Sequence, residues 1–394
     1  MNFNKIGRGI YIFMIYLLSV SLAFSISATT VILGFILLLY LLNFKDSFKK
    51  SPKDFLLILV FYTWRAFTLS IYSGYIKAIL KFFNGIWDFL AYPLIASGKI
   101  NERVVKNVIS IAIWINVAIF IYAILQKLFG FPIIYKDLFW GDYRYSGFYS
   151  NPIRFAGYYS SVLILSFIFG LFINRVYLFA FTILTLGLLL TGARTYWISV
   201  FVVLLAVSFV KSKKTVAYLL FSIASIIVVY FIFFKEYLME RLIFIEQHIE
   251  FRLNFWKAGI EIFLSNPLFG VGYGEVGRYL QPYFAKGLID NTAHCHNTYI
   301  TVLAENGIIG FILLIVFFVY FIKKYWKYYK TEKDRLLKAL ALGLFAIFMN
   351  LIMASFTEHI LKNFTLWTFA GLLMGLFEAY KAGEPSPQGL QTSL

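Results

Sequence analysis

The sequence of 394 residues is 61% hydrophobic and 21% aromatic, and only 14% of its residues are charged. A soluble domain cannot bury so much apolar surface, so this composition excludes a soluble globular protein. The net charge of +17 would suit a nucleic-acid ligand, but the excess Lys and Arg residues are spread over short polar joints between apolar stretches. The cytoplasmic loops of a membrane protein have this distribution, so we expect no nucleic-acid partner.

Long apolar stretches and short polar joints alternate along the chain. A bilayer core about 30 Å thick needs about 20 apolar residues per helix, and the chain supplies about twelve such stretches. Every second joint is rich in Lys and Arg, which predicts that these joints and both termini lie in the cytoplasm. The basic joints are 45–54, 98–106, the turn at Arg175, 211–214 and 323–338. The joints expected to face outward are 72–77, about 127–153, 191–194, about 235–295 and 355–364.

The alternation predicts an all-α polytopic membrane protein with one transmembrane domain over residues 1–382. The longer outward loop, about 235–295, is expected to contain short amphipathic helices. The polar segment 383–394 is rich in Pro and Gly and is expected to be a disordered tail. Near the other end, the helix expected over 9–27 resembles a signal peptide, but a second apolar run over 29–43 follows at once, which predicts a retained helical hairpin.

Two charged residues, Arg65 and Asp88, lie in neighbouring apolar stretches. A charge inside a membrane costs at least about 2.5–3.5 kcal/mol, so each should have a reason to be there. We expect the two side chains to pair as a structural lock, and contact between Arg65 and a substrate is the alternative. Buried charges also suit a transporter or flippase with a polar pathway, although the further charges and broken, repeated helices of such proteins are not evident in the sequence.

The outward loop contains a segment, 249–267, with helical periodicity. Arg252, Trp256, Ile260 and Phe263 recur at three- or four-residue spacing and share one face, and Ser265 to Pro267 should end the helix. A helix with Trp beside Arg favours the membrane interface, where the guanidinium can meet phosphates or simply anchor the loop to lipid.

Beyond this helix, Gly272, Gly274 and Gly277 spell GxGxxG. No strand precedes them, so a dinucleotide site is not indicated. Two readings stay open, a flexible loop that lets backbone approach a ligand and a plain turn.

The most specific stretch is 294–322, where polar residues lead directly into a membrane helix with His296 at its outer end. Gly307 should lie about 16 Å below His296, at a depth where Gly307 and Gly310 allow close helix packing. Glu305 should face away from His296 and bond a neighbouring helix. The short run His294 to His296 lacks the spacing of a metal site, and its cysteine, Cys295, is the only one in the chain, so no internal disulfide can form.

These residues resemble a known family, the O-antigen ligases with their related polymerases and O-linked oligosaccharyltransferases. The hallmark of that family is His, then Asn, Ser or Gln, then nine residues and Gly-x-x-Gly, and His296, Asn297, Gly307 and Gly310 match it without a gap. Weaker similarities are Arg252 with Trp256, Pro267 with Gly270 and Gly272, TGARTYW at 191–197 and SGFYSNPIRFAGYY at 146–159.

The resemblance implies a membrane-embedded glycosyltransferase of the GT-C type, inverting, metal-independent and without a cofactor, with an undecaprenyl diphosphate-linked glycan as donor. It implies that His296 is the essential histidine and that Arg194 and Arg252 bind the donor diphosphate, supported by Asn297, Trp256, Gly307 and Gly310. The chemistry agrees, because two guanidiniums can meet a departing diphosphate without magnesium. A histidine near its usual pKa can also take the proton of a sugar hydroxyl at neutral pH.

Three reactions remain open within this superfamily. They are ligation of O-antigen to lipid A-core in lipopolysaccharide biosynthesis, polymerisation of repeat units, and glycosylation of Ser or Thr on proteins. Ligation is our first expectation, at the periplasmic face of a bacterial inner membrane, because polymerases usually match the His296 motif less well and the protein transferases usually carry a further C-terminal domain.

Overall fold

The computed structural model describes residues 5–42, 44–130, 137–140, 144–243 and 245–383. The tail expected to be disordered lies, except for its first residue, outside the described residues. The helices are α1 (Lys5–Phe24), α2 (Ile26–Leu42), α3 (Phe44–Lys50), α4 (Phe55–Ser73), α5 (Tyr75–Trp87), α6 (Ala91–Ala96), α7 (Glu102–Phe129), α8 (Pro152–Phe172), α9 (Val176–Leu190), α10 (Arg194–Lys211), α11 (Lys213–Ile243), α12 (Ile245–Ser265), α13 (Val276–Ala285), α14 (Thr298–Thr331), α15 (Arg335–Ala354) and α16 (Phe364–Lys381). Two short strands, β1 (Phe139–Trp140) and β2 (Arg144–Tyr145), pair antiparallel, and the 3₁₀ turn η1 (Ile360–Lys362) precedes α16.

The all-helical membrane architecture is confirmed. Within the described residues, eight helices are long and apolar enough to cross a bilayer, namely those containing 7–24, 55–73, 102–129, 152–172, 194–211, 213–232, 298–331 and 335–354. The apolar helices α2 and α9 are shorter, so the expected number of about twelve spans is not confirmed. The helical hairpin at the start of the chain is present, because α1 and α2 pack against each other across a one-residue break.

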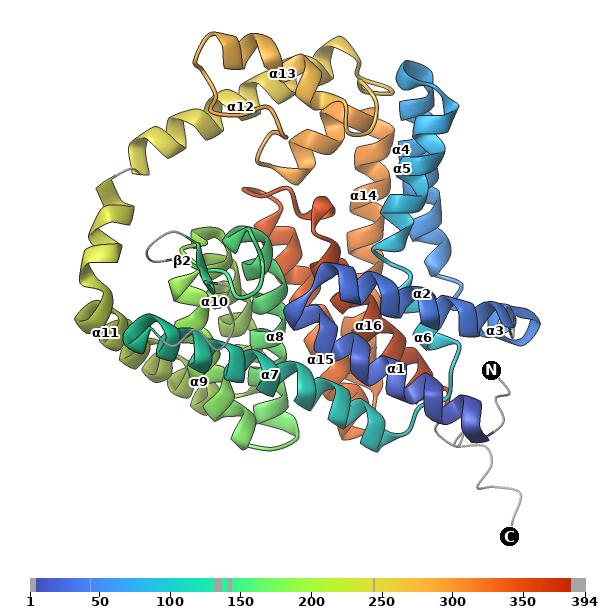
Figure 1. Ribbon diagram of the computed structural model, residues 1–394, viewed down its shortest axis with the longest axis vertical. Helices are drawn as coiled ribbons and strands as arrows, with labels where there is room; N and C mark the ends of the chain where they lie inside the picture. The colour runs from blue at the N-terminus through green and yellow to red at the C-terminus, as the bar shows by residue number, and fades with distance from the viewer. Residues whose placement is uncertain (1–4, 43, 131–136, 141–143, 244, 384–394) are drawn as a thin grey trace.

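The centre of the molecule is formed by α8, α15 and α16 (Figure 1). Almost every residue of α8 is buried although the helix is long enough to span a membrane, so other helices surround it on all sides. Asn116, Ser160, Ser199 and Asn350 carry polar groups into this core and bond one another or nearby groups, with a Ser199 Oγ to Asn350 Oδ1 distance of 2.6 Å. These bonds satisfy polar atoms that neither lipid nor water reaches.

Above this body, α12 and α13 form a cap that rests on the first turns of α14 (Figure 1). The cap has its own small core, composed of Phe255, Ala258, Ile262, Val271, Val276, Leu280, Ile289, Cys295 and Ala304. The helix predicted over 249–267 is therefore confirmed, and it ends at Ser265 as expected. Its buried face is the one that carries Phe255 and Ile262, next to the face that carries Arg252 and Trp256.

The helix α14 is broken at Gly307, which corrects the expectation of a regular helix with a glycine packing face. Gly307 has φ 66° and ψ −170°, a conformation that only glycine adopts readily. The loop 267–272 fills the break, because Val271 N–H donates to the Ala304 carbonyl at 2.8 Å and Ile308 N–H donates to the Pro267 carbonyl at 2.9 Å. Backbone polar groups at membrane depth are thus satisfied by protein.

One glycine of the loop, Gly270, and Gly307 of α14 make this docking possible. A Cβ on Gly270 would lie 2.4 Å from the Glu305 carbonyl carbon, and a Cβ on Gly307 would lie 2.1 Å from the Leu268 carbonyl oxygen. The close approach that these glycines allow is therefore to the backbone of α14. Gly274 and Gly277 of the GxGxxG segment lie beyond this loop, so its two readings, a ligand loop and a plain turn, stay open.

The expected lock between Arg65 and Asp88 is wrong, because the nearest carboxylate of Arg65 belongs to Glu305 on α14. Arg65 Nη2 and Glu305 Oε2 are 3.7 Å apart, and both side chains are fully buried. The Arg65 guanidinium also lies 3.5 Å from the centre of the Tyr273 ring. Glu305 thus faces a neighbouring helix, as expected, through an ion pair that links α4 to α14 beneath the cap.

Candidate active site

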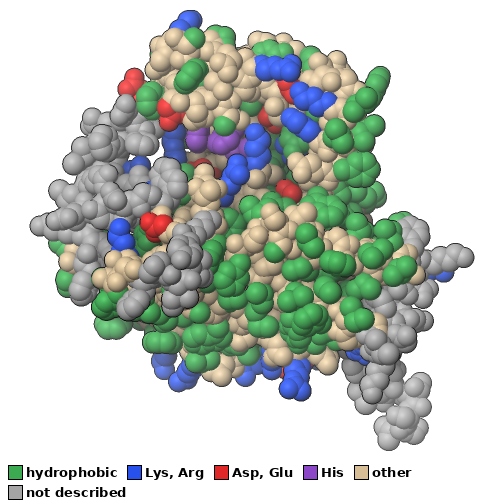
Figure 2. Space-filling view, viewed as in Figure 1, with side chains coloured by type: hydrophobic (Ala, Val, Ile, Leu, Met, Phe, Trp, Pro, Cys, Tyr) green, Lys and Arg blue, Asp and Glu red, His purple; other side chains and the backbone are tan. Residues whose placement is uncertain are grey.

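His296 lies between the cap and the helical body, one residue before the N-cap of α14. Asn297 is that N-cap, since its Oδ1 accepts from Ile300 N–H at 3.0 Å, while its Nδ2 donates to the Phe356 carbonyl at 2.9 Å. Figure 2 shows histidine side chains in a hollow below the cap, with Lys and Arg side chains around them. His296 has φ 48°, the one positive φ among the described non-glycine residues.

Two further histidines, His294 and His359, lie close to His296. The ring of His294 lies 4.4 Å from that of His296, and the ring of His359 lies 5.3 Å from that of His294, measured between centroids. On the cap side, Phe255 packs on His296 at 4.9 Å, and Asn291 Nδ2 is 3.3 Å from His296 Nε2. His296 is therefore held by protein on several sides.

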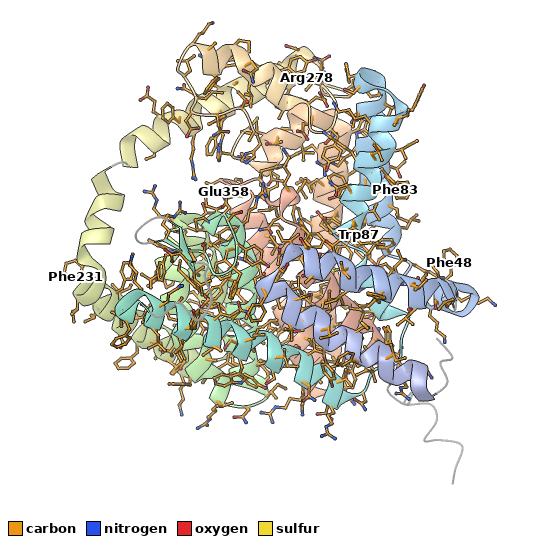
Figure 3. All side chains as sticks on the ribbon, in the orientation of Figure 1. Phe48, Phe83, Trp87, Phe231, Arg278 and Glu358 are labelled. Carbon is orange, nitrogen blue, oxygen red and sulfur yellow. The ribbon has the colours of Figure 1, made fainter. Side chains whose placement is uncertain are left out.

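Arg252 reaches the same hollow from α12 and pairs with Glu358. The distance from Arg252 Nη2 to Glu358 Oε1 is 3.2 Å, and Figure 3 shows Glu358 beneath α12. The backbone of Glu358 is fixed to α14, because Thr298 Oγ1 donates to the Glu358 carbonyl at 2.7 Å. The loop 355–363 thus connects the cap arginine to the start of the His296 helix.

Arg194 begins α10 at the border of this region. The next residue, Thr195, shares a hydrogen bond of 2.6 Å with Thr357, and Tyr196 is close enough to Glu358 for the two to interact electrostatically. The first turn of α10 therefore touches the same loop that holds Glu358.

Other cations surround the histidines. Arg154 at the start of α8 and Lys362 in η1 both act electrostatically on His294, and Lys362 Nζ donates to the Ala293 carbonyl at 3.3 Å. Arg144 acts on Glu358, and its Nε donates to the Thr191 carbonyl at 3.0 Å. Four cations from four separate elements thus act on this region, Arg252 and Arg144 on Glu358 and Arg154 and Lys362 on His294, which makes the hollow electropositive.

Burial and these cations change the acid–base behaviour of the site. Burial, reinforced by the positive charge of Arg252 and partly opposed by Asp290, lowers the pKa of His296 to about 4. The expectation of a pKa near the usual value is therefore wrong. Burial also raises the pKa of Glu358 to about 7, despite the opposing effects of Arg252 and Arg144. At neutral pH His296 is an uncharged imidazole that can accept a proton.

The structure brings only part of the expected site together. His296, Asn297 and Arg252 lie around the hollow, whereas Gly307 and Gly310 lie deeper and serve the packing of loop 267–272 and of Trp64 against α14. Trp256 is half-buried on the cap helix, and its indole N–H has no hydrogen-bond partner among the residues that the structure describes. The roles of these residues in binding and catalysis stay predictions.

Sequence reasoning missed Glu358 and His359. Both belong to the joint 355–364, for which the sequence predicted only an outward loop. The available signal was the occurrence of two adjacent ionisable residues between two apolar helices, and both prove to be buried. Among the described residues, no group of three or more His, Cys, Asp or Glu side chains has a geometry that could hold a metal ion.

Comparison with protein families gives a match over residues 178–315 to the family described as O-antigen ligase. This segment contains Arg194, Arg252 and the complete His296 motif. A comparison with curated proteins gave no significant match. The family match agrees with the resemblance carried by the His296 motif, and it covers residues 178–315 of the chain.

Proposed function

We propose that the protein is an O-antigen ligase, which transfers a glycan from undecaprenyl diphosphate to a sugar hydroxyl of lipid A-core at the periplasmic face of the inner membrane. The observation that carries this proposal is the position of uncharged His296 beside Arg252 in an electropositive hollow. A proton acceptor and a concentration of cations are the two groups that such a transfer requires.

The donor side of the reaction needs positive charge. When the glycosidic bond to the carrier breaks, the departing diphosphate gains charge, and guanidinium groups can stabilise it by paired hydrogen bonds. Arg252 and Arg194 are the residues proposed for this role, with Arg154 near enough to His294 to contribute. A diphosphate would compete with Glu358 for Arg252, whose side chain remains about one-third exposed at 35%.

The acceptor side needs a base. His296 would take the proton of the sugar hydroxyl as that oxygen attacks the anomeric carbon, and a single displacement of this kind inverts the configuration. Burial and, after it, the charge of Arg252 lower the pKa of His296. A bound diphosphate would offset that charge and raise the pKa of His296, so the base would strengthen when donor is present.

The carrier lipid would need an apolar surface beside the hollow. A cavity of about 550 Å³ lies between α9, α10 and α11, and its lining includes Leu188, Trp197 and Ala224. Trp197 is in the first turn of α10, three residues after Arg194. We propose that part of the isoprenoid chain lies there. The variant Ala224→Trp should raise the KM for a long-chain donor, and a donor with a short prenyl chain serves as control because it would not reach the added ring.

Reconstitution tests the proposed reaction directly. Purified protein in chelator would be given undecaprenyl diphosphate-linked glycan and lipid A-core, with His296→Ala in parallel. A His296-dependent upward shift of the core on a gel is the expected result. A ladder growing on the carrier lipid would indicate a polymerase, transfer to a protein acceptor would indicate an O-linked oligosaccharyltransferase, and glycan movement across a vesicle without transfer would indicate a transporter. Activity that chelator removes and magnesium restores would contradict the metal-independent mechanism.

A further inference from the structure

His294 forms a turn with His296 through its own side chain. Its Nδ1 accepts the backbone N–H of His296 at 3.1 Å. The Nδ1 atom is attached to Cγ, as the Oδ1 of asparagine is, so this bond is the histidine counterpart of the Asx turn, in which a side chain accepts the N–H two residues further on. An accepting Nδ1 carries no proton, which requires the neutral ring.

The turn holds an unfavourable conformation. His296 has φ 48°, in the left-handed region that few non-glycine residues adopt. The surroundings here are the bond to His294, the bond from Cys295 N–H to Thr301 Oγ1 at 3.3 Å, and the helix cap formed by Asn297. The bond to His294 is the one that acts on the backbone of His296 itself.

The ring of His294 also has neighbours that keep it in place. It lies beside the rings of both His296 and His359, and His359 is buried with neither ring nitrogen hydrogen-bonded within the described part of the chain. Burial, with smaller effects from His296, Lys362 and Arg154, lowers the pKa of His294 to about 3, so its ring stays neutral in the physiological range. The acceptor nitrogen is thus available at every pH at which transfer would be measured.

We propose that His294 is a positioning residue for transfer: its Nδ1 holds the backbone of His296 in the left-handed turn that directs the imidazole into the hollow. This inference rests on the proposed function, because it gives His296 the role of base. His294 itself would not touch the substrate.

Two substitutions separate the acceptor atom from the aromatic ring. The variant His294→Asn keeps an acceptor at the position of Nδ1 and removes the ring, whereas His294→Phe keeps a ring of similar size and removes the acceptor. We expect His294→Phe to lower kcat about 10²-fold, the loss typical of a misplaced catalytic group, with little change in the donor KM. We expect His294→Asn to retain most of kcat. Melting temperatures in detergent would confirm that both variants are folded.

A second measurement does not depend on activity. The rate at which diethyl pyrocarbonate modifies His296, read by mass spectrometry, should increase in His294→Phe and stay near the native rate in His294→Asn. Near-native kcat in His294→Phe, or equal losses in both variants, would overturn the positioning role. If the native protein shows no transfer, the proposed function fails, and the modification rates still decide whether His294 holds His296.

Discussion

Arg252 on α12 and Glu358 in the loop before η1 form an ion pair of 3.2 Å although they are 106 residues apart in the sequence. This pair joins the cap to the helical body at the hollow that contains His296. Arg252 is a site residue that the sequence predicts, whereas Glu358 is not.

Glu358 should make stability depend on pH. Its pKa is raised to about 7 in the folded protein from an ordinary 4.5, so folding favours its protonated form. That contribution to stability is fully present below about 4.5 and is lost as the pH rises through about 7. Between roughly pH 5 and pH 8, which span most of this range, the melting temperature in detergent should therefore fall less for Glu358→Gln than for the native protein. An unchanged pH dependence would show that Glu358 does not titrate in this range.

Arg252→Lys should weaken donor use because an ammonium cannot form the paired hydrogen bonds of a guanidinium. We expect kcat/KM for the donor to fall about tenfold to a hundredfold, the effect of one lost bond to a charged group. Arg278→Lys is the matched control, since Arg278 lies on α13 with its side chain 70% exposed and pairs with Glu275 (Figure 3). Equal effects of the two substitutions would argue against a specific role for Arg252.

His296→Ala should reduce transfer about 10²–10⁴-fold, the usual contribution of a general base, without loss of membrane insertion. In the native protein, kcat/KM should fall as the pH drops toward about 4, where free His296 becomes protonated. The corresponding fall in kcat should occur at higher pH, because the bound diphosphate offsets the charge of Arg252. Steady-state rates over pH, with Glu358→Gln to identify any contribution from that carboxyl, would test this. Identical midpoints for kcat and kcat/KM would contradict it.

Gly307→Ala should destabilise the protein and release loop 267–272. Its backbone conformation costs a non-glycine residue on the order of 1–3 kcal/mol, and the new Cβ would also meet the Leu268 carbonyl oxygen at 2.1 Å. Gly34→Ala is the control, because a Cβ there meets nothing within 4 Å and an alanine favours the helix α2. Thermal unfolding in detergent would measure both. A Gly307→Ala protein as stable as the control would mean that the break in α14 is not required.

The buried pair of Arg65 and Glu305 predicts strong coupling. Removing one partner, as in Arg65→Met or Glu305→Leu, leaves an uncompensated buried charge and should lower the free energy of unfolding by about 3–5 kcal/mol. The double variant should recover much of that loss, because two apolar side chains need no partner. Unfolding of the four proteins in detergent completes the double-mutant cycle. Strictly additive losses would show that the two charges do not depend on each other.

Local patterns in the sequence were sufficient for the helices and for part of the site. Apolar runs near 20 residues predict membrane helices because backbone groups in lipid must bond within their own segment. The helix over 249–267 and the start of the His296 helix were equally predictable, since the periodicity, the end signal at Ser265 and the change from polar to apolar residues after His296 are local.

Only the tertiary structure decided which distant groups meet. Arg65 pairs with Glu305 rather than Asp88, and Glu358 and His359 join His296, because helix packing brings together segments between which the sequence has no fixed spacing. The break at Gly307 also depends on packing, since loop 267–272 supplies the hydrogen bonds that the helix loses there. The low pKa of His296 follows from the same cause, because burial under the cap and the charge of Arg252 exist only in the folded protein.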